Sequence, residues 1–220
     1  MKTLNDSPFR SAEKFVMEKM GAFVPPFIGT KHLSFLGLLS SAGILLSYYL
    51  CRISYAFLFL ASFFIIMEWI FDCLDGAIGR ARNEGFVMWG YYMDHLFDYI
   101  FLSAIMFGFH LLFPEAGLQV LFLFVILSLF MNIFFLMQGA VCNSEFKISF
   151  WGIGPIEFRL FIIFFNIALY FNAAAIKGFL GKNFIFVNLI ILAGLLIVIY
   201  FHQKKLDELD MVNHSAQKKD

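Results

Sequence analysis

Charged residues are scarce in this chain: Asp, Glu, Lys and Arg make up only 15% of its 220 residues, and the formal net charge is zero. A polyphosphate partner normally requires a stripe of Lys and Arg, so this balance argues against a nucleic-acid-binding protein. Only three cysteines are present, without metal-ligand spacing, and no disulfide framework is expected. The first 32 residues lack the short apolar core of a secretory signal peptide, and we predict no cleaved signal.

Hydrophobic residues dominate instead. They make up 61% of the chain, Phe alone accounts for 32 residues, and they gather in long runs. A helix crosses the hydrocarbon core of a bilayer with about 20 residues. Six segments have roughly that length: 33–50, 53–71, 91–113, 118–141, 158–175 and 183–202. The sequence therefore predicts an all-α, polytopic integral membrane protein, built as a bundle of six transmembrane helices.

Positive charges divide unevenly between the two ends of such a bundle. An even number of spans places both termini on one side, and 13 of the 16 Lys and Arg residues then fall on that side. The three on the other side are Arg52, Lys177 and Lys182. Positive charge favours the cytoplasmic face. We therefore expect the termini and the connections 72–90 and 142–157 to face the cytoplasm.

The chain is expected to form a single domain that begins with an interfacial segment over residues 1–32. Within it, residues 11–24 mix apolar and charged side chains in the manner of an amphipathic helix lying on the membrane. Pro25 and Pro26 should end this helix, because neither nitrogen can donate a helical hydrogen bond. The polar tail, residues 203–220, is expected to be cytoplasmic and frayed.

Four aspartates lie near the second connection. Asp72 and Asp75 are three residues apart at the end of the second span, and Asp94 and Asp98 are four apart at the start of the third. Each pair shares one face of a helix. Antiparallel neighbours would bring the pairs to a similar depth, so we expect one acidic cage. Carboxylates in a membrane repel one another unless a cation compensates, and the cage therefore predicts bound divalent metal.

The ligand chemistry of this cage favours a hard cation. Its ligands are carboxylates without a His or Cys pairing, so we expect Mg²⁺ first, with Mn²⁺ as an alternative. Four carboxylates can hold two ions. His95 follows Asp94 but lies off the helix face shared with Asp98, and we interpret it as a packing residue or one that supports a ligand.

Glycines and arginines accompany the acids. Gly76, Gly79 and Gly90 leave space beside the cage for a bulky ligand, although glycines in membrane helices also serve helix packing. Arg80 can donate a fork of hydrogen bonds to phosphate. Arg82 is interpreted as a positive charge that faces the lipid headgroups.

The full pattern is Asp72-x-x-Asp75-Gly76-x-x-Gly79-Arg80, then Gly90-x-x-x-Asp94-x-x-x-Asp98. It resembles the signature of the CDP-alcohol phosphotransferases, also called CDP-alcohol phosphatidyltransferases. Two positions depart from it: the family usually has Ala in place of Gly79, and residues 81–89 form a spacer one residue longer than usual. All four acidic positions are kept.

The resemblance implies roles for these residues. The first three aspartates of the pattern would be metal ligands, and Asp98 would ligate metal or act as the general base. The residues implied to line the CDP site are Gly76, Arg80 and Gly90. The enzyme would transfer a phosphoalcohol, most naturally a phosphatidyl group, from a CDP-linked donor to an acceptor hydroxyl with release of CMP, in phospholipid biosynthesis. The resemblance also implies that the chain can form a homodimer.

Several alternatives stay open at this point. The substrates are either CDP-diacylglycerol with a polar alcohol, or CDP-choline or CDP-ethanolamine with diacylglycerol. A cation transporter would also cluster carboxylates, but near the middle of the bilayer and beside broken helices. An inactive protein of the same fold is disfavoured because no acidic position is lost.

A second polar group lies near the start of the fifth span. Lys147, Glu157 and Arg159 are expected on the side of the acidic cage, where they could contact the acceptor or a phosphate. The alternative is an ordinary helix start in which Arg159 reaches toward lipid headgroups. Glu68, one turn before Asp72, either supports the cage or pairs with another residue.

Overall fold

The computed structural model describes residues 3–4, 10–85, 87–140, 146–147 and 155–217. Its helices are α1 (Arg10–Phe15), α2 (Thr30–Leu50), α3 (Phe57–Ala81), α4 (Val87–Leu112), α5 (Gly117–Ala140) and α6 (Pro155–Gln217). Shorter elements are a π-helical turn (Val16–Met20), two 3-10 turns (Gly21–Phe23 and Pro114–Ala116) and the strands β1 (Thr3–Leu4) and β2 (Phe146–Lys147). The two strands pair in parallel.

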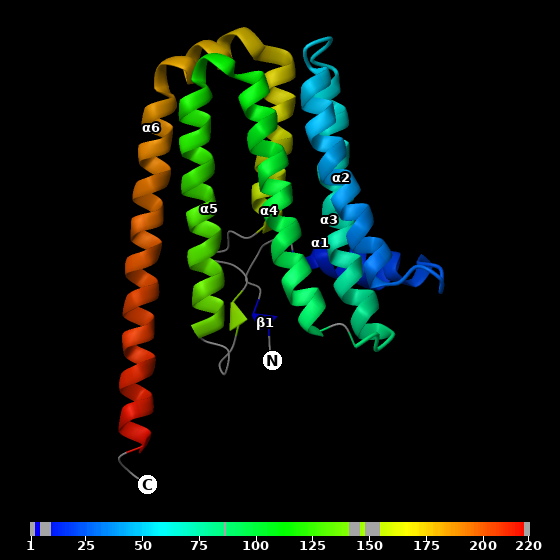
Figure 1. The fold of residues 1–220 in the computed structure, drawn as a ribbon, viewed down its shortest axis with the longest axis vertical. Coiled ribbons are helices and arrows are strands. Elements are labelled where there is room, and N and C mark those ends of the chain that lie inside the picture. Colours follow the sequence, from blue (N-terminus) through cyan, green and yellow to red (C-terminus); the bar gives the residue numbers. More distant parts are fainter. Residues whose placement is uncertain (1–2, 5–9, 86, 141–145, 148–154, 218–220) are drawn as a thin grey trace.

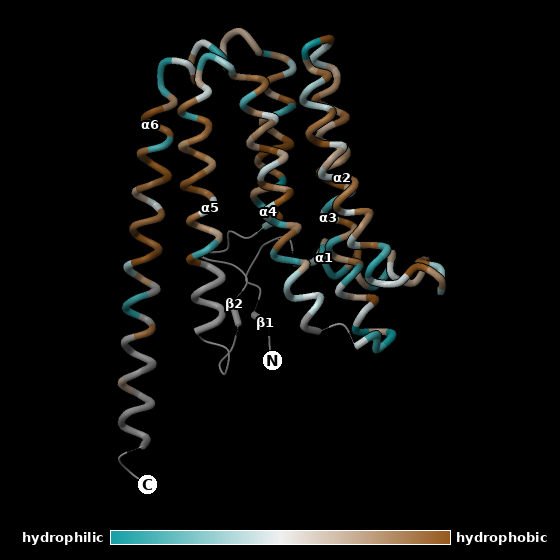
Figure 2. The backbone as a smooth tube through the Cα atoms, in the orientation of Figure 1, coloured by the Kyte–Doolittle hydropathy of each residue, from teal (hydrophilic) through white to brown (hydrophobic). Residues whose placement is uncertain are grey.

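Helices α2 to α6 form an elongated bundle (Figure 1). Figure 2 shows hydrophobic residues along their length and hydrophilic residues gathered toward the ends. Among the described residues, five helical stretches are long and apolar enough to cross a membrane, and the last of them, Pro155–Phe201, has 47 residues. At about 1.5 Å per residue it is roughly twice as long as the hydrocarbon core is thick. The predicted all-α, polytopic membrane architecture is confirmed.

Helix α6 supplies the fifth and sixth predicted spans. It leaves helical geometry at Asn172 (φ −136°, ψ 39°). Beyond this kink it turns across the upper end of the bundle in Figure 1 and descends beside α5. The prediction of a frayed tail after Tyr200 is wrong, because α6 continues to Gln217. No Gly or Pro interrupts residues 201–217, and Lys, Leu, Gln and Glu in this segment favour helix.

The turn between α3 and α4 is short because α3 continues ten residues past its predicted end, so the Asp72 to Arg80 motif is helical. Asn83 has a positive φ of 52° directly after the helix. The amides of Asn83 and Glu84 donate to the carbonyl oxygens of Arg80 and Gly79, at 3.3 and 3.1 Å. These are the two bonds of a Schellman cap, which ends a helix at a left-handed residue.

The N-terminal segment packs beside this motif. The predicted helix over 11–24 is present, but it becomes a π-helical turn after Phe15 and ends before Pro25. Val16 is buried in a cluster with Leu74 and Ile78 of α3. Phe15 on the same segment is exposed, as expected of a side chain that meets lipid.

Arg82 fastens this segment to the turn. Its guanidinium donates to the carbonyl oxygens of Val24 and Ile28, at 2.8 and 2.6 Å. It also donates to the carbonyls of Pro25 and Pro26, at 3.3 and 3.4 Å. The interpretation of Arg82 as a charge that faces headgroups is therefore wrong. The helix ends at the two prolines, and Arg82 donates to carbonyl oxygens of the irregular segment that follows it.

A polar contact deep in the bundle joins three helices. The Tyr48 hydroxyl of α2 donates to Asn166 of α6 at 3.0 Å, and the Asn166 amide donates to Ser62 of α3 at 3.1 Å. All three side chains are buried. Hydrogen bonds of this kind fix the relative rotation of membrane helices, and this one holds the first arm of α6 against α3.

Candidate active site

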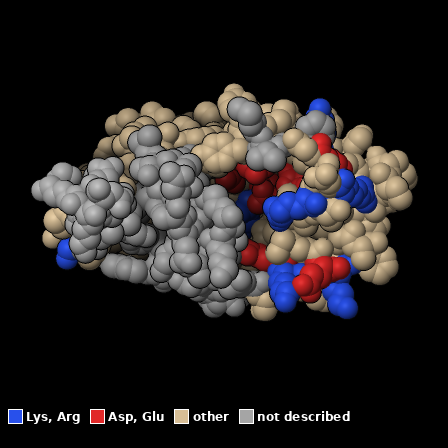
Figure 3. Space-filling view, turned by 90° about the horizontal axis from the view of Figure 1, so that it is seen from below, with Lys and Arg blue, Asp and Glu red and all other residues tan. Residues whose placement is uncertain are grey.

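Acidic side chains gather at the lower end of the bundle in Figure 1. Seen from that end, Asp and Glu side chains lie in a hollow with Lys and Arg side chains at its rim (Figure 3). Asp72 and Asp75 come from α3, and Asp94 and Asp98 come from α4. The Asp72 carboxylate interacts electrostatically with each of the other three. The four predicted aspartates therefore share one electrostatic environment.

The helices that carry these acids pack on a third helix rather than on each other. Both α3 and α4 lie against α2, and their own backbones make few direct contacts. The prediction that the two pairs of aspartates form one cage between adjoining helices is therefore corrected, because α2 lies against both of their helices. The side chains of Asp72 and Asp98 retain 42% and 34% of their exposure as a result.

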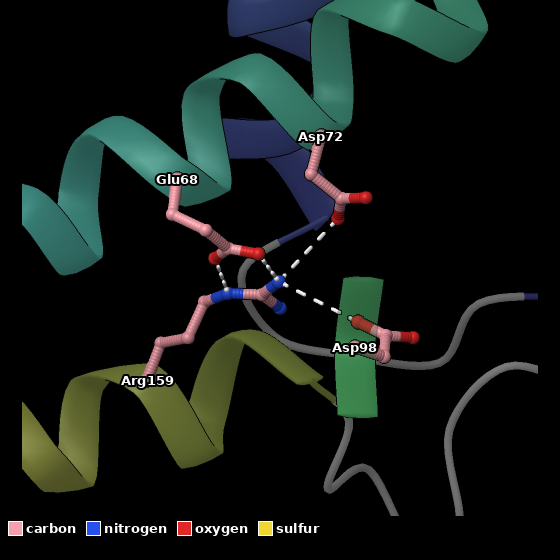
Figure 4. A network of polar contacts seen from close by, with 4 residues as sticks. All are labelled: Glu68, Asp72, Asp98 and Arg159. Atoms are coloured by element: carbon pink, nitrogen blue, oxygen red, sulfur yellow. Dashed lines mark hydrogen bonds and ion pairs between the residues drawn. The ribbon is translucent and has the colours of Figure 1, made fainter. Parts of the chain in front are cut away.

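Arg159 stands between the two acidic helices (Figure 4). Its Nε donates to Glu68 Oε2 at 2.8 Å, and its Nη2 donates to Glu68 Oε1 at 3.0 Å. The same Nη2 lies 3.5 Å from Asp72 Oδ2 and 3.9 Å from Asp98 Oδ1. Arg159 and Glu68 keep only 4% and 6% of their side-chain exposure. Arg159 therefore points into the bundle, and the alternative in which it reaches toward headgroups is wrong.

This ion pair shows that Glu68 pairs with another residue, Arg159. Glu68 lies one turn before Asp72 on α3, and Arg159 lies in the second turn of α6, whose first arm packs on α3. A bidentate pair of a carboxylate with a guanidinium is among the strongest side-chain contacts in proteins. The face of Phe101 covers the guanidinium, with its carbon 4.9 Å from the ring centroid.

Asp75 is held by two residues of α2. The Ser34 hydroxyl donates to Asp75 Oδ2 at 2.7 Å, and the Thr30 hydroxyl donates to the Asp75 carbonyl oxygen at 3.1 Å. Asp75 itself is only 5% exposed. Because a buried carboxylate is costly without donors, Ser34 orients this acid and compensates part of its burial.

We predict that Ser34→Ala lowers the free energy of unfolding by about 1.5–3 kcal/mol, the range for a hydrogen bond to a charged group. Ser40→Ala is the matched control, since the Ser40 hydroxyl is also buried but donates to the Leu36 carbonyl of its own helix, at 2.9 Å. Unfolding of both variants in one detergent would be measured. Equal losses in the two variants would show that Ser34 has no special role at Asp75.

The glycines of the motif occupy three different settings. A Cβ on Gly76 would lie 3.1 Å from Arg80 Nη1, so this glycine makes room for the Arg80 side chain. A Cβ on Gly79 would lie 2.8 Å from Thr30 Oγ1, so Gly79 lets α2 approach α3. No atom lies within 4 Å of such a Cβ at Gly90. Lining of a CDP site by these glycines stays a prediction.

Arg80 lies near the acids as well as beside Gly76. Its charge interacts favourably with Asp94, and the Arg80 side chain is exposed. An exposed guanidinium at the edge of an acidic hollow can still bind an incoming phosphate. Arg80 is thus positioned to bridge an anionic ligand and the aspartates.

The predicted metal ligands lie too far apart in the structure to surround one ion. Among the residues that the structure describes, no three His, Cys, Asp or Glu side chains are close enough together to hold a metal ion. The donor chemistry, four carboxylates, nonetheless suits a hard divalent cation. Metal binding would require the carboxylates to come closer together. In the structure, the Arg159 guanidinium lies between Asp72 and Asp98.

The remaining predicted residues lie in α6, β2 and α4. Glu157 lies half-buried in the first turn of α6, two residues before Arg159. Lys147 lies in β2, and its side chain is outside the part of the chain that the structure describes. The His95 ring packs on the Tyr91 ring with centroids 4.3 Å apart, as expected for a packing residue.

The sequence pattern did not reveal the Ser34 contact or the Glu68–Arg159 pair. Ser34 lies four residues after Thr30 in α2, and this pair of hydroxyls on one helix face was the available signal. Two oppositely charged residues within predicted spans were the signal for the ion pair, because an intramembrane charge usually has a partner.

Comparison with known proteins gives one match. The family model for CDP-alcohol phosphatidyltransferases matches residues 31–200, which include every helix from α2 to the second arm of α6. Searches of curated proteins and of solved structures found no match. The matched region contains all four aspartates, Glu68 and Arg159.

Proposed function

Because this chain belongs to the CDP-alcohol phosphatidyltransferase family, whose model covers most of its length, we propose that it transfers a phosphatidyl group from a CDP-linked donor to an acceptor hydroxyl. CMP is the second product, and the reaction serves phospholipid biosynthesis. The observation that carries this proposal is the electrostatic interaction of Asp72 with the other three aspartates, and of Arg80 with Asp94, at the end of the bundle where Asp and Glu side chains lie in a hollow (Figure 3).

The proposed reaction is a single displacement at phosphorus. The acceptor oxygen forms a bond to the phosphorus that carries the donor alcohol, and the bond from that phosphorus to the CMP oxygen breaks. Asp98 takes the proton of the acceptor hydroxyl as general base. Arg80 and the backbone near Gly76 and Gly90 hold the phosphates of the nucleotide. Arg159, Glu157 and Lys147 are proposed to lie near the acceptor.

Divalent metal is part of the proposal. Asp72, Asp75, Asp94 and Asp98 would hold one or two Mg²⁺ ions, or Mn²⁺ in their place. When bound, the metal would neutralise charge on the pyrophosphate and on departing CMP. The carboxylate-only donor set supports this assignment.

The membrane setting supports a lipid substrate. The exposed side chains of α2 to α6 are largely apolar, so a diacylglycerol moiety can remain in the bilayer while its headgroup reaches the hollow. We propose that the hollow faces the cytoplasm, because 13 of the 16 Lys and Arg residues lie on the predicted side of the termini.

The experiment that tests the function measures CMP release from purified protein in detergent with Mg²⁺. CDP-diacylglycerol would be offered with serine, inositol, inositol phosphate or glycerol phosphate, and CDP-choline or CDP-ethanolamine would be offered with diacylglycerol. We expect release of CMP only with CDP-diacylglycerol and one acceptor. Release with a CDP-amino alcohol instead would replace the phosphatidyl donor, and no release with any pair would contradict the proposed enzyme.

A further inference from the structure

The Arg159 guanidinium is bound unevenly by the three acids that surround it. Both of its bonds to Glu68 are short, at 2.8 and 3.0 Å, whereas Asp72 and Asp98 lie at 3.5 and 3.9 Å. Contacts beyond about 3.2 Å are weak hydrogen bonds at best. Arg159 therefore gives its shortest contacts to Glu68, as the dashed lines in Figure 4 show, and the side chains of Asp72 and Asp98 stay 42% and 34% exposed.

The position of this charge matters because arginine does not lose its proton in proteins. A guanidinium with no other partner would be attracted to Asp72 and Asp98, both of which are less than 4 Å away. The buried Glu68 carboxylate limits this approach, because it holds the guanidinium by two shorter bonds. The pair is neutral as a whole, so it leaves the net charge of the four aspartates unchanged.

We infer that the two short bonds from Glu68 hold the Arg159 guanidinium so that it approaches Asp72 and Asp98 no closer than 3.5 Å, which leaves these two carboxylates available to a divalent cation. Glu68 and Arg159 are in this view positioning residues, and Glu68 is not itself a ligand. The inference rests on the metal site of the proposed function. When all four aspartates are ionised, they carry four negative charges beside the neutral pair, which two divalent ions would balance.

Direct binding of Mn²⁺ to the purified full-length protein tests this inference without any turnover. Free Mn²⁺ would be measured by electron paramagnetic resonance during titration. Glu68→Gln should weaken Mn²⁺ binding by about 10- to 100-fold, the usual effect of disturbing a residue that orients ligands. Glu18→Gln is the control: it removes the same charge from a surface residue whose Lys14 partner lies at 3.6 Å, and binding should not change.

A double variant, Glu68→Gln with Arg159→Met, separates positioning from ligation. Removing both charges restores a neutral pair, and Met fills the apolar contact with Phe101. Mn²⁺ binding of the double variant should return to within about threefold of the parent protein. Glu68→Gln alone leaves Arg159 buried without its main partner and could fail to fold for that reason. The double variant lacks this buried charge, so Mn²⁺ binding can still be tested with it.

Two results would overturn the inference. If Glu68→Gln binds Mn²⁺ like the parent protein, the pair has a purely structural role. If the double variant remains as weak as Glu68→Gln, Glu68 is a ligand. Failure of the parent protein to bind Mn²⁺ is a different result, because it contradicts the proposed metal site and removes the basis of the inference with it.

Discussion

Asp98→Asn is expected to lower the rate of CMP release by about 10²- to 10⁴-fold, the usual contribution of a general base. The amide has the size of the carboxylate and can still accept a contact from Arg159 Nη2, which lies 3.9 Å from Asp98 Oδ1. It cannot take the proton of an acceptor hydroxyl. The loss should therefore appear in turnover and not in folding. Initial rates with saturating substrates, together with elution profiles and circular dichroism, would measure both.

The matched control for this variant is Glu115→Gln. Glu115 is exposed in the 3-10 turn before α5, at the opposite end of α4 from the acids. It should retain the activity of the parent protein. An Asp98→Asn protein with near-normal turnover would exclude Asp98 as the base and leave it at most a ligand.

The helices and the approximate place of the acids could be predicted from the sequence, because both depend on local patterns. Apolar runs of about 20 residues determine the spans. The spacing of Asp72 and Asp75, and of Asp94 and Asp98, places each pair on one helix face. The family motif added an expected chemistry for those faces.

Features that depend on packing between distant segments could not be predicted in the same way. Glu68 and Arg159 are 91 residues apart in sequence, and their contact exists because the first arm of α6 packs on α3. The role of Arg82 likewise depends on the path of residues 24–28, whose carbonyl oxygens come within reach of its guanidinium. Charge patterns gave Arg82 a headgroup-facing interpretation and left the same interpretation open for Arg159, since periodicity does not tell which neighbour covers a helix face.

The spacing of the acids also led to the prediction of one closed acidic cage, which the structure does not show. Short connections make consecutive helices antiparallel, but they do not require close packing. Helix α2 lies against both α3 and α4. The resulting opening leaves Asp72 and Asp98 partly exposed, where a ligand can enter, and it explains why the described acids do not close around one point.

Removal of divalent cations should stop CMP release, with a loss of roughly 100-fold or more, and Mg²⁺ should restore it. The physical reason is the repulsion between Asp72 and the other three aspartates. Arg159 offsets this repulsion only in part, because its shortest contacts are with Glu68. Protein treated with a chelator and then dialysed would be assayed with no metal, with Mg²⁺ and with Mn²⁺.

Thermal unfolding provides the independent measurement for this prediction. An ion that binds only the folded protein stabilises it by about 2.7 kcal/mol at a concentration 100 times its Kd. Mg²⁺ should therefore raise the unfolding temperature of the parent protein, and the increase should shrink in Asp72→Asn, which removes one charge at the centre of the cluster. Full activity in the presence of excess chelator, with no change in the unfolding temperature on adding Mg²⁺, would mean that Arg159 and Arg80 alone balance the acids and that the transfer proceeds without metal.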